Sequence, residues 1–378
     1  MSAFFLAFLV ILGTVWGWVW FRLVEPSALP PFAYWPLAAV FTASFALQFL
    51  RWIFRAYFDA RPWLQQVAYF FFGQMIILLF AALAKDAALS LAHLAGFPPS
   101  LHFERIASAI ALGLGILGEL WGIRTAWHGL VVRKVRVALP HWPATHLGLK
   151  VAQISDLHVG ASIKADYVAK VVQRVMDLEP DLIVLTGDLG DGNVFELQKD
   201  LEPLRRLRAP HGVFYVAGNH EYYWNVRAWM AKMKELGFTV LENEGRWLAK
   251  AKLWVGGVPD FTAHKMEPNG ASDPARAFPK EKVNGPSLLL AHQPKSIAAA
   301  AAAGFDMMVC GHTHSGQFFP ANLLVRFFNP YHHGLHRHEN TWIYVNAGTG
   351  FWGPPLRLFV PPEITLFRLE PESRVTVG

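Results

Sequence analysis

The sequence predicts an α/β domain preceded by an all-α transmembrane region. Hydrophobic residues make up 53% of the 378 residues, and the excess lies before residue 125 in four long apolar runs. After residue 148, apolar stretches of strand length alternate with amphipathic stretches of helix length, which is typical of a largely parallel sheet covered by helices. We therefore divide the chain into a transmembrane region (1–124), a connector (125–147) and an α/β domain (148–378).

Each of the four apolar runs approaches the ~20 residues that cross the ~30 Å hydrocarbon layer of a bilayer. The runs cover residues 4–21, 33–50, 66–84 and 106–123. Tryptophan, which prefers the headgroup region, occurs near their ends at Trp16, Trp18, Trp20, Trp35, Trp52, Trp63, Trp121 and Trp127. The first run could be a cleaved signal sequence, but no Lys or Arg precedes it, so we interpret it as a retained helix.

Basic residues are divided unevenly among the loops between these runs. The loops after the second and fourth runs contain Arg51, Arg55, Arg61, Arg124, Arg133, Lys134 and Arg136. The alternate loops contain only Arg22, Lys85 and Arg105. Because basic loops tend to stay in the cytoplasm, we expect a multi-pass protein of the cell (inner) membrane with both termini and the α/β domain on the cytoplasmic side.

Seven strands and three helices are expected in the α/β domain. The strands are predicted at 149–155, 182–187, 212–217, 287–291, 306–310, 342–346 and 363–369. The helices are predicted at 163–178, 194–207 and 225–236. Residues 247–258 fit a hairpin that begins a second sheet.

Five fragments of this domain are hydrophobic chain that ends abruptly in side chains able to bind a metal. They supply Asp156 and His158, Asp188, Asn219 and His220, His292, and finally His312 and His314. Parallel strands deliver the residues at their carboxyl ends to one edge of a sheet, so these side chains are expected to converge. Within each of the pairs 156/158 and 312/314, residues two apart would project from the same face of an extended turn.

The residue types indicate the metals. A mixture of imidazole nitrogens and oxygens, without thiolate, suits Mn, Fe, Zn or Ni better than Mg or Ca. Seven ligands are too many for one tetrahedral ion, but they suffice for two ions that share a bridging carboxylate. We expect two divalent ions, with Mn favoured.

These fragments resemble the motifs of the calcineurin-like metallophosphoesterases: Asp-x-His, Gly-Asp, Gly-Asn-His, His and Gly-His-x-His. The resemblance covers roughly residues 148–350, and every motif position is filled. The apolar N-terminal runs make the chain similar to the membrane-attached subgroup. Where members of that subgroup usually have Ser-Arg-Gly, this chain has Asn346-Ala347-Gly348, so no phosphate-binding role of that Arg carries over.

The resemblance implies a four-layer αββα sandwich and a role for each ligand residue. One ion would be held by Asp156, His158 and His314, and the other by Asn219, His292 and His312. Asp188 would bridge the two ions. His220 would not be a ligand but the acid that protonates the leaving oxygen or stabilises the charged transition state.

The function expected from these features is phosphoester hydrolysis by metal-activated water. Membrane attachment favours a phosphodiester or a lipid-linked phosphate, although a soluble nucleotide or a phosphoprotein is an alternative substrate. A membrane sensor or scaffold without activity is an alternative from another class. Residues 146–378 contain 24 basic and 23 acidic residues, which disfavours a nucleic-acid substrate.

Two further features of the sequence have more than one interpretation. The stretch from Phe318 to His338 mixes bulky apolar and cationic residues, which fits either an ordinary loop or an interfacial lid that touches lipid. Leu324 and Phe328 would share a face if this stretch were helical. Gly118 and Gly122 form a small-xxx-small pair that could let another helix approach.

Overall fold

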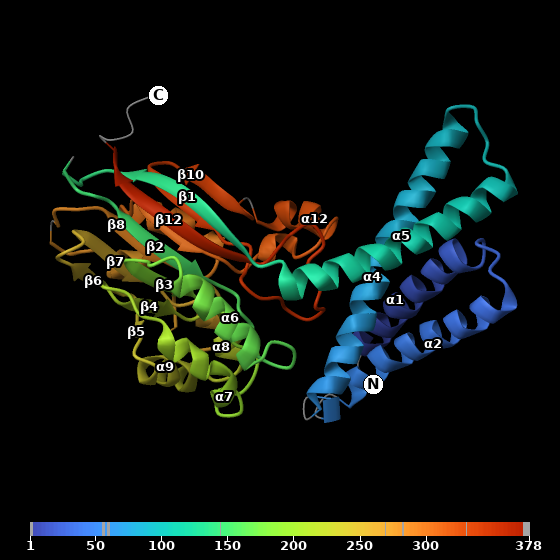
Figure 1. The fold of residues 1–378 in the computed structure, drawn as a ribbon, viewed down its shortest axis with the longest axis horizontal. Helices are drawn as coiled ribbons and strands as arrows, with labels where there is room; N and C mark the ends of the chain where they lie inside the picture. The colour runs from blue at the N-terminus through green and yellow to red at the C-terminus, as the bar shows by residue number, and fades with distance from the viewer. Residues whose placement is uncertain are drawn as a thin grey trace. The chain divides into compact units, whose positions relative to one another are not determined.

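The computed structural model describes residues 3–372 except 55–56, 59–60, 144, 269, 282 and 330. Arg55, one of the predicted cytoplasmic loop residues, therefore lies outside the described residues. The chain forms two compact units (Figure 1). The helix unit contains residues 1–124 and the short segment 353–358, and the catalytic unit contains residues 125–352 and 359–378.

Four apolar helices form most of the helix unit. They are α1 (Ala3–Val19, continued by a π-helical turn, Trp20–Val24), α2 (Pro31–Ile53), α4 (Pro62–Leu94) and α5 (Leu101–His128). Among the described residues, α2, α4 and α5 are long and apolar enough to cross a membrane, and α1 is shorter. Of the four expected spans, three are therefore found as candidate membrane-spanning helices in the described part of the chain, and the first run forms a shorter apolar helix.

The first sheet of the catalytic unit has the strand order β1-β12-β2-β3-β4-β5. Its strands are β1 (Val131–Leu139), β2 (Leu149–Ile154), β3 (Leu182–Thr186), β4 (Val213–Val216), β5 (Thr239–Val240) and β12 (Glu363–Pro371). The strands from β2 to β5 are parallel, and only the β12–β2 pair is antiparallel. The carboxyl ends of β2, β3 and β4 consequently lie at one edge.

The second sheet has the order β10-β11-β9-β8-β7-β6. Its strands are β6 (Glu244–Leu248), β7 (Leu253–Gly257), β8 (Ser287–Leu290), β9 (Met307–Cys310), β10 (Gly334–His338) and β11 (Thr341–Val345). Its central strands β7, β8, β9 and β11 are parallel, and the edge strands are antiparallel. The predicted hairpin near 247–258 is confirmed as β6 and β7.

Successive side chains of a strand point to opposite faces of its sheet, so each strand contributes to the packing on both sides of the sheet. Leu288 and Leu290 pack with Val184 and Val216 of the first sheet, whereas Leu289 points to the opposite face. Strands covered on both faces have few polar positions, which is why β3, β8 and β9 are continuous apolar runs.

Short helices cover the outer faces of the two sheets. The first sheet is covered by α6 (Ala165–Met176) and α9 (Val226–Glu235), and the second by α10 (Pro274–Ala277) and α11 (Ile297–Ala303). In α6, Val168, Val171, Val172 and Val175 recur at helical spacing and are buried. The predicted four-layer αββα sandwich is confirmed.

Three local predictions needed correction. The connector expected at 125–147 contains β1, which pairs along its whole length with β12. The helix expected at 194–207 is only α7 (Gln198–Leu201) and a 3-10 turn (Glu202–Arg206), because Pro203 cannot continue an α-helix. The stretch 318–338 is not one loop, since it contains α12 (Ala321–Phe328) and β10.

Candidate metal centre

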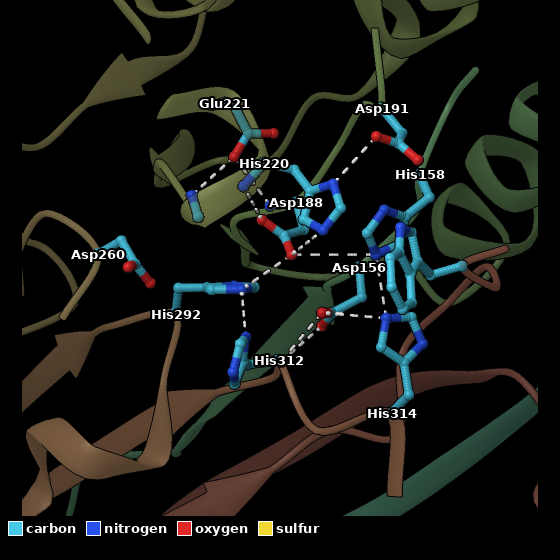
Figure 2. A network of polar contacts seen from close by, with 12 residues as sticks. Asp156, His158, Asp188, Asp191, His220, Glu221, Asp260, His292, His312 and His314 are labelled. Carbon is cyan, nitrogen blue, oxygen red and sulfur yellow. Dashed lines mark hydrogen bonds and ion pairs between the residues drawn. The ribbon is translucent and has the colours of Figure 1, made fainter. Parts of the chain in front are cut away.

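All the side chains predicted from the five fragments lie at the carboxyl ends of β2, β3, β4, β8 and β9 or directly beyond them. Figure 2 shows most of them converging from these loops. Asp156, His158, Asp188, His292 and His314 are buried, and Asn219 and His220 are at most 9% exposed. The expected convergence at one sheet edge is therefore observed.

The backbone that presents these side chains differs from the expected extended turn. Asp156, His158, Asp188, His312 and His314 all have left-handed backbone, with φ between 48° and 70°. Residues with side chains seldom adopt this conformation, and it persists only where the surrounding structure enforces it. Here Asp156 N–H donates to the Gly187 carbonyl and His158 N–H to the Asp188 carbonyl, so the two loops hold each other.

The first group of possible ligands consists of Asp156, His158 and His314. His158 Nε2 lies 3.0 Å from His314 Nε2, and His314 Nε2 lies 3.5 Å from Asp156 Oδ1. Two imidazole nitrogens and a carboxylate oxygen at this spacing could share one divalent ion.

The second group consists of Asp188, His292 and His312. His292 Nε2 lies 3.1 Å from Asp188 Oδ2 and 3.3 Å from His312 Nδ1. The same oxygen, Asp188 Oδ2, is 3.9 Å from His158 Nε2 of the first group. One carboxylate oxygen therefore faces both groups, as a bridging ligand must.

Two further observations indicate that these side chains could bind divalent ions. Among the described residues, Asn219 Oδ1 is a buried oxygen without a hydrogen-bond partner, which is costly unless something else binds it. His292 Nδ1 faces the Thr186 carbonyl at 2.7 Å, which fixes the tautomer and leaves Nε2 free to bind a metal.

Burial and repulsion by neighbouring histidines lower the pKa of two ligand histidines, His158 and His312. Burial, reinforced by nearby His220, lowers the pKa of His158 to about 3. Burial and nearby His292 lower the pKa of His312 to about 4. Both rings are neutral at physiological pH, which is the form that binds metals.

His220 has a different environment from the ligand histidines. Its Nδ1 lies 3.1 Å from Asp191 Oδ1, and its Nε2 lies 3.9 Å from Asp188 Oδ2. Burial opposes protonation, but Asp188 and Asp191 outweigh it and raise the pKa of His220 to about 9. Together with His158 and Asp191, His220 also forms a third group that could hold a metal by geometry alone.

Two functional residues escaped the sequence analysis. Asp191 orients His220, and its only sequence signal is that it follows Gly187-Asp188 by three residues. Glu221 is fully buried and accepts backbone N–H groups from Asp188, Leu189, Gly190 and Gly218, at 2.9, 2.7, 3.4 and 2.7 Å. Its signal was its place three residues after Gly218 at the start of α8 (Asn219–Tyr223), the spacing of a capping box.

Comparison with known proteins agrees with this geometry. The model of the calcineurin-like phosphoesterase family matches residues 149–316. An uncharacterized metallophosphoesterase of Helicobacter pylori is 38% identical over 280 residues, which cover 72% of this chain and 74% of that protein. A transmembrane protein with a metallophosphoesterase domain from Danio rerio is 30% identical over 324 residues, covering 81% and 74%. An uncharacterized metallophosphoesterase of Campylobacter jejuni is 29% identical and aligns over 96% of both chains. The chain belongs to the calcineurin-like phosphoesterase family and is a metal-dependent phosphoesterase.

Proposed function

We propose that this chain is a membrane-anchored phosphoesterase that uses two divalent ions to hydrolyse a phosphodiester or a lipid-linked phosphate. The observation that carries the proposal is Asp188 Oδ2, which faces ligand nitrogens of both groups, at 3.1 Å from His292 and 3.9 Å from His158. Asp156, His158 and His314 would hold one ion, and Asn219, His292 and His312 the other, with Asp188 shared. The mixed nitrogen and oxygen donors favour Mn, with Fe, Zn and Ni as alternatives.

When bound, the ions would supply Lewis-acid activation of water and neutralise the charge of the phosphoryl oxygens. The residues of the chain would hold the geometry. Glu221 fixes the loop after β3 to the start of α8 through its four backbone contacts. These contacts keep Asp188, in the loop after β3, at a constant distance from Asn219, the first residue of α8. No side-chain nucleophile is required.

His220 is proposed as the acid that protonates the leaving oxygen. Its Nδ1 faces Asp191, so the ring is held with Nε2 directed toward the ligand groups. Trp224 Nε1 donates to the same Asp191 oxygen at 3.2 Å, which restricts the carboxylate further. A ring held in this way can deliver a proton at a fixed position.

Helix α12 supports a substrate at a lipid surface. It begins seven residues after His314, and Leu323, Leu324, Phe327 and Phe328 are 44%, 50%, 83% and 76% exposed. Arg326 lies among them, and its Nε is 3.3 Å from His332 Nε2. A helix that combines exposed phenylalanines with a cation suits the boundary between acyl chains and phosphate headgroups.

The proposed side of the membrane rests on the loop charges. If the catalytic unit lies on the cytoplasmic side of the cell (inner) membrane, a reporter fused after Gly378 should report cytoplasm and one inserted near Pro98 should report the outside. A C-terminal reporter on the outer side would overturn this orientation.

The proposed activity can be tested directly. The purified protein, supplied with Mn, should be assayed on an aryl phosphodiester, an aryl phosphomonoester and a lipid extract, with Asp188→Ala as the control. We expect hydrolysis by the wild-type protein alone and release of a phosphorylated product from the lipid extract. Hydrolysis of the soluble esters without any lipid product would favour the soluble-substrate alternative.

Replacing Phe327 and Phe328 by Ser should slow hydrolysis of a lipid phosphoester in vesicles by ~10-fold while sparing a small soluble ester. The physical reason is the loss of part of the apolar burial that the two phenylalanines would gain in the acyl boundary. Leu147→Ser is the matched control, because Leu147 is 88% exposed and precedes the amino end of β2, away from the ligands. Equal losses on both substrates would contradict a lipid role of α12.

A further inference from the structure

A cavity of about 350 Å³, here called the α1–α2 cavity, lies between the first two helices of the helix unit. The two helices pack side by side within this unit (Figure 1). The volume is in the range of small-molecule sites, roughly 300–1,000 Å³. All the residues that line the cavity belong to the helix unit, so the metal centre does not account for it.

Small residues leave the space that forms the α1–α2 cavity. Gly13 and Gly17 lie one turn apart on α1, and Ala38 lines the cavity from α2. A Cβ added at Gly17 would have no atom within 4 Å, and one added at Gly13 would only touch the Phe45 ring at 3.8 Å. Close packing of the two helices therefore does not require either glycine, and the space beside them stays open.

Aromatic rings line the sides of the cavity. Trp16 and Trp20 come from α1 and the π-helical turn that continues it, and Phe41 and Phe45 come from α2. The Trp16 and Phe45 rings meet edge-on with centroids 6.2 Å apart, and the Trp20 and Phe41 rings at 5.3 Å. Each pair joins the two helices, so packing within the helix unit fixes the position of all four rings.

The polar side-chain groups of the lining residues already have partners. Trp16 Nε1 donates to Ser44 Oγ at 2.9 Å, and Trp20 Nε1 donates to Glu25 Oε1 at 3.0 Å. Thr42 Oγ1 donates to a carbonyl of its own helix at 2.9 Å. The cavity therefore offers carbon atoms to an occupant, and a polar occupant would lose its hydrogen bonds to water without replacing them.

The place of the cavity along the helices indicates that its occupant comes from the membrane. Helix α2 is long and apolar enough to cross a bilayer, and Val10–Val24 is a shorter apolar helix. The rings of Trp20 and Tyr34 meet edge-on at 5.4 Å near the loop that joins the helices, and such rings prefer the headgroup region. Gly13 lies seven residues before Trp20, or about 10 Å along a helix. The cavity thus extends from the headgroup level into the hydrocarbon layer.

We propose that the α1–α2 cavity binds one hydrocarbon chain of a membrane lipid, whose polar part lies at the level of Trp20. A helix of a second copy fits less well. A small-xxx-small pair binds another helix by close approach of the two backbones, and the aromatic rings beside Gly13 and Gly17 prevent that approach. A helix with its side chains is also about 10–12 Å across, whereas a chain of methylene groups is narrow enough to lie between the rings.

The test measures lipid binding to the purified full-length protein in detergent. The protein is titrated with a phosphatidylcholine that carries a photoreactive diazirine in one acyl chain, and the labelled peptides are identified by mass spectrometry. Labelling of α1 and α2 at the cavity should saturate at about one lipid per chain, because a preformed site has a fixed capacity. An excess of ordinary phosphatidylcholine should suppress this labelling.

Gly17→Leu fills the cavity and should lower the labelling of α1 and α2 by ~10-fold or more, since forcing a chain into an already filled space is unfavourable by about that factor. Gly113→Leu in α5 is the matched control, because a Cβ there also has no atom within 4 Å and Gly113 does not line the cavity. Both changes replace a helical glycine by a better helix former, so neither should lower the thermal midpoint in detergent.

Ala38→Leu fills the same cavity from α2 and decides the test if Gly17→Leu does not fold. Equal labelling of the cavity residues in Gly17→Leu, Ala38→Leu and Gly113→Leu would overturn the proposal. A wild-type dimer that Gly17→Leu separates into monomers while the labelling stays unchanged, measured by light scattering, would also overturn it and assign the cavity to a second copy. Hydrolysis is not measured, so failure of the proposed function leaves this test intact.

Discussion

Each unit of the molecule contains a cluster of ionisable side chains that are at least partly buried, and the two clusters are satisfied in different ways. In the helix unit, Arg22 Nε and Nη2 each donate to Asp86 at 2.7 Å. Lys85 Nζ lies 3.2 Å from Asp86 Oδ1 and donates to Ser108 Oγ at 3.2 Å. Each of these charged groups therefore has a partner of opposite charge without any added group.

The catalytic unit instead brings two carboxylates and five imidazoles together around shared positions. Asp188 Oδ2 faces three of the histidines, and the buried Asn219 Oδ1 has no hydrogen-bond partner in the described part of the chain. An incompletely satisfied buried cluster costs stability, so it persists only where function requires it. The comparison teaches that burial of charge alone does not mark a site, whereas burial with unsatisfied ligand atoms does.

The largest difference between the clusters should appear on removal of the shared carboxylate. We expect Asp188→Ala to lose both ions and to reduce kcat/KM by ~10³-fold or more, because Asp188 contributes to both ligand groups. Elemental analysis and the aryl phosphodiester assay measure the two effects. One tightly bound ion in a fully active wild-type preparation would instead mean that the site is not binuclear.

His220 should separate metal binding from acid catalysis. We expect His220→Gln to retain both ions and to lower kcat by ~10²–10⁴-fold, since a positioned acid contributes about that much. Metal content and kcat should be measured on the same sample. Loss of an ion from this variant would assign His220 to the third ligand group instead.

The sequence predicted the convergence of the site well, because strand ends in a parallel sheet must meet at one edge. Asp156, Asp188 and His312 are each preceded by an apolar strand, and that pattern is visible along the chain. Their left-handed backbone was not predictable, because it is enforced by contacts such as Asp156 N–H to the Gly187 carbonyl, which join loops ~30 residues apart.

Asp191 and Glu221 were missed because they act through partners that only the folded chain brings near. In a sequence, an isolated acidic residue in a loop is usually a cap or a solvated group. β1 was missed because its basic residues, Arg133, Lys134 and Arg136, are typical of an exposed edge strand and resemble a polar connector.

A smaller effect is expected from Asp191, which contacts His220 and is not one of the predicted metal ligands. Asp191→Asn should keep the metal content and lower kcat by ~10–10²-fold, because the amide can still accept from His220 or Trp224 but no longer carries the charge that holds the ring. Lys199→Gln, at an exposed position of α7, is the control. Unchanged kcat in Asp191→Asn would show that the carboxylate has no part in positioning His220.

The smallest effect on catalysis is expected from a change in the helix-unit cluster of Arg22, Lys85 and Asp86. Asp86→Asn removes the charge that Arg22 and Lys85 share, and it should lower stability by about 1–3 kcal/mol, the usual loss for a hydrogen bond to a charged group. Metal content and kcat with a soluble ester should not change, because the hydrogen bonds of this cluster involve none of the ligand residues. The thermal midpoint in detergent measures the first effect, and His102→Gln, at an exposed position of α5, is the control. If kcat falls in Asp86→Asn while the thermal midpoint stays constant, this cluster also has a function. A fully paired set of charges would then not by itself be evidence of a purely structural role.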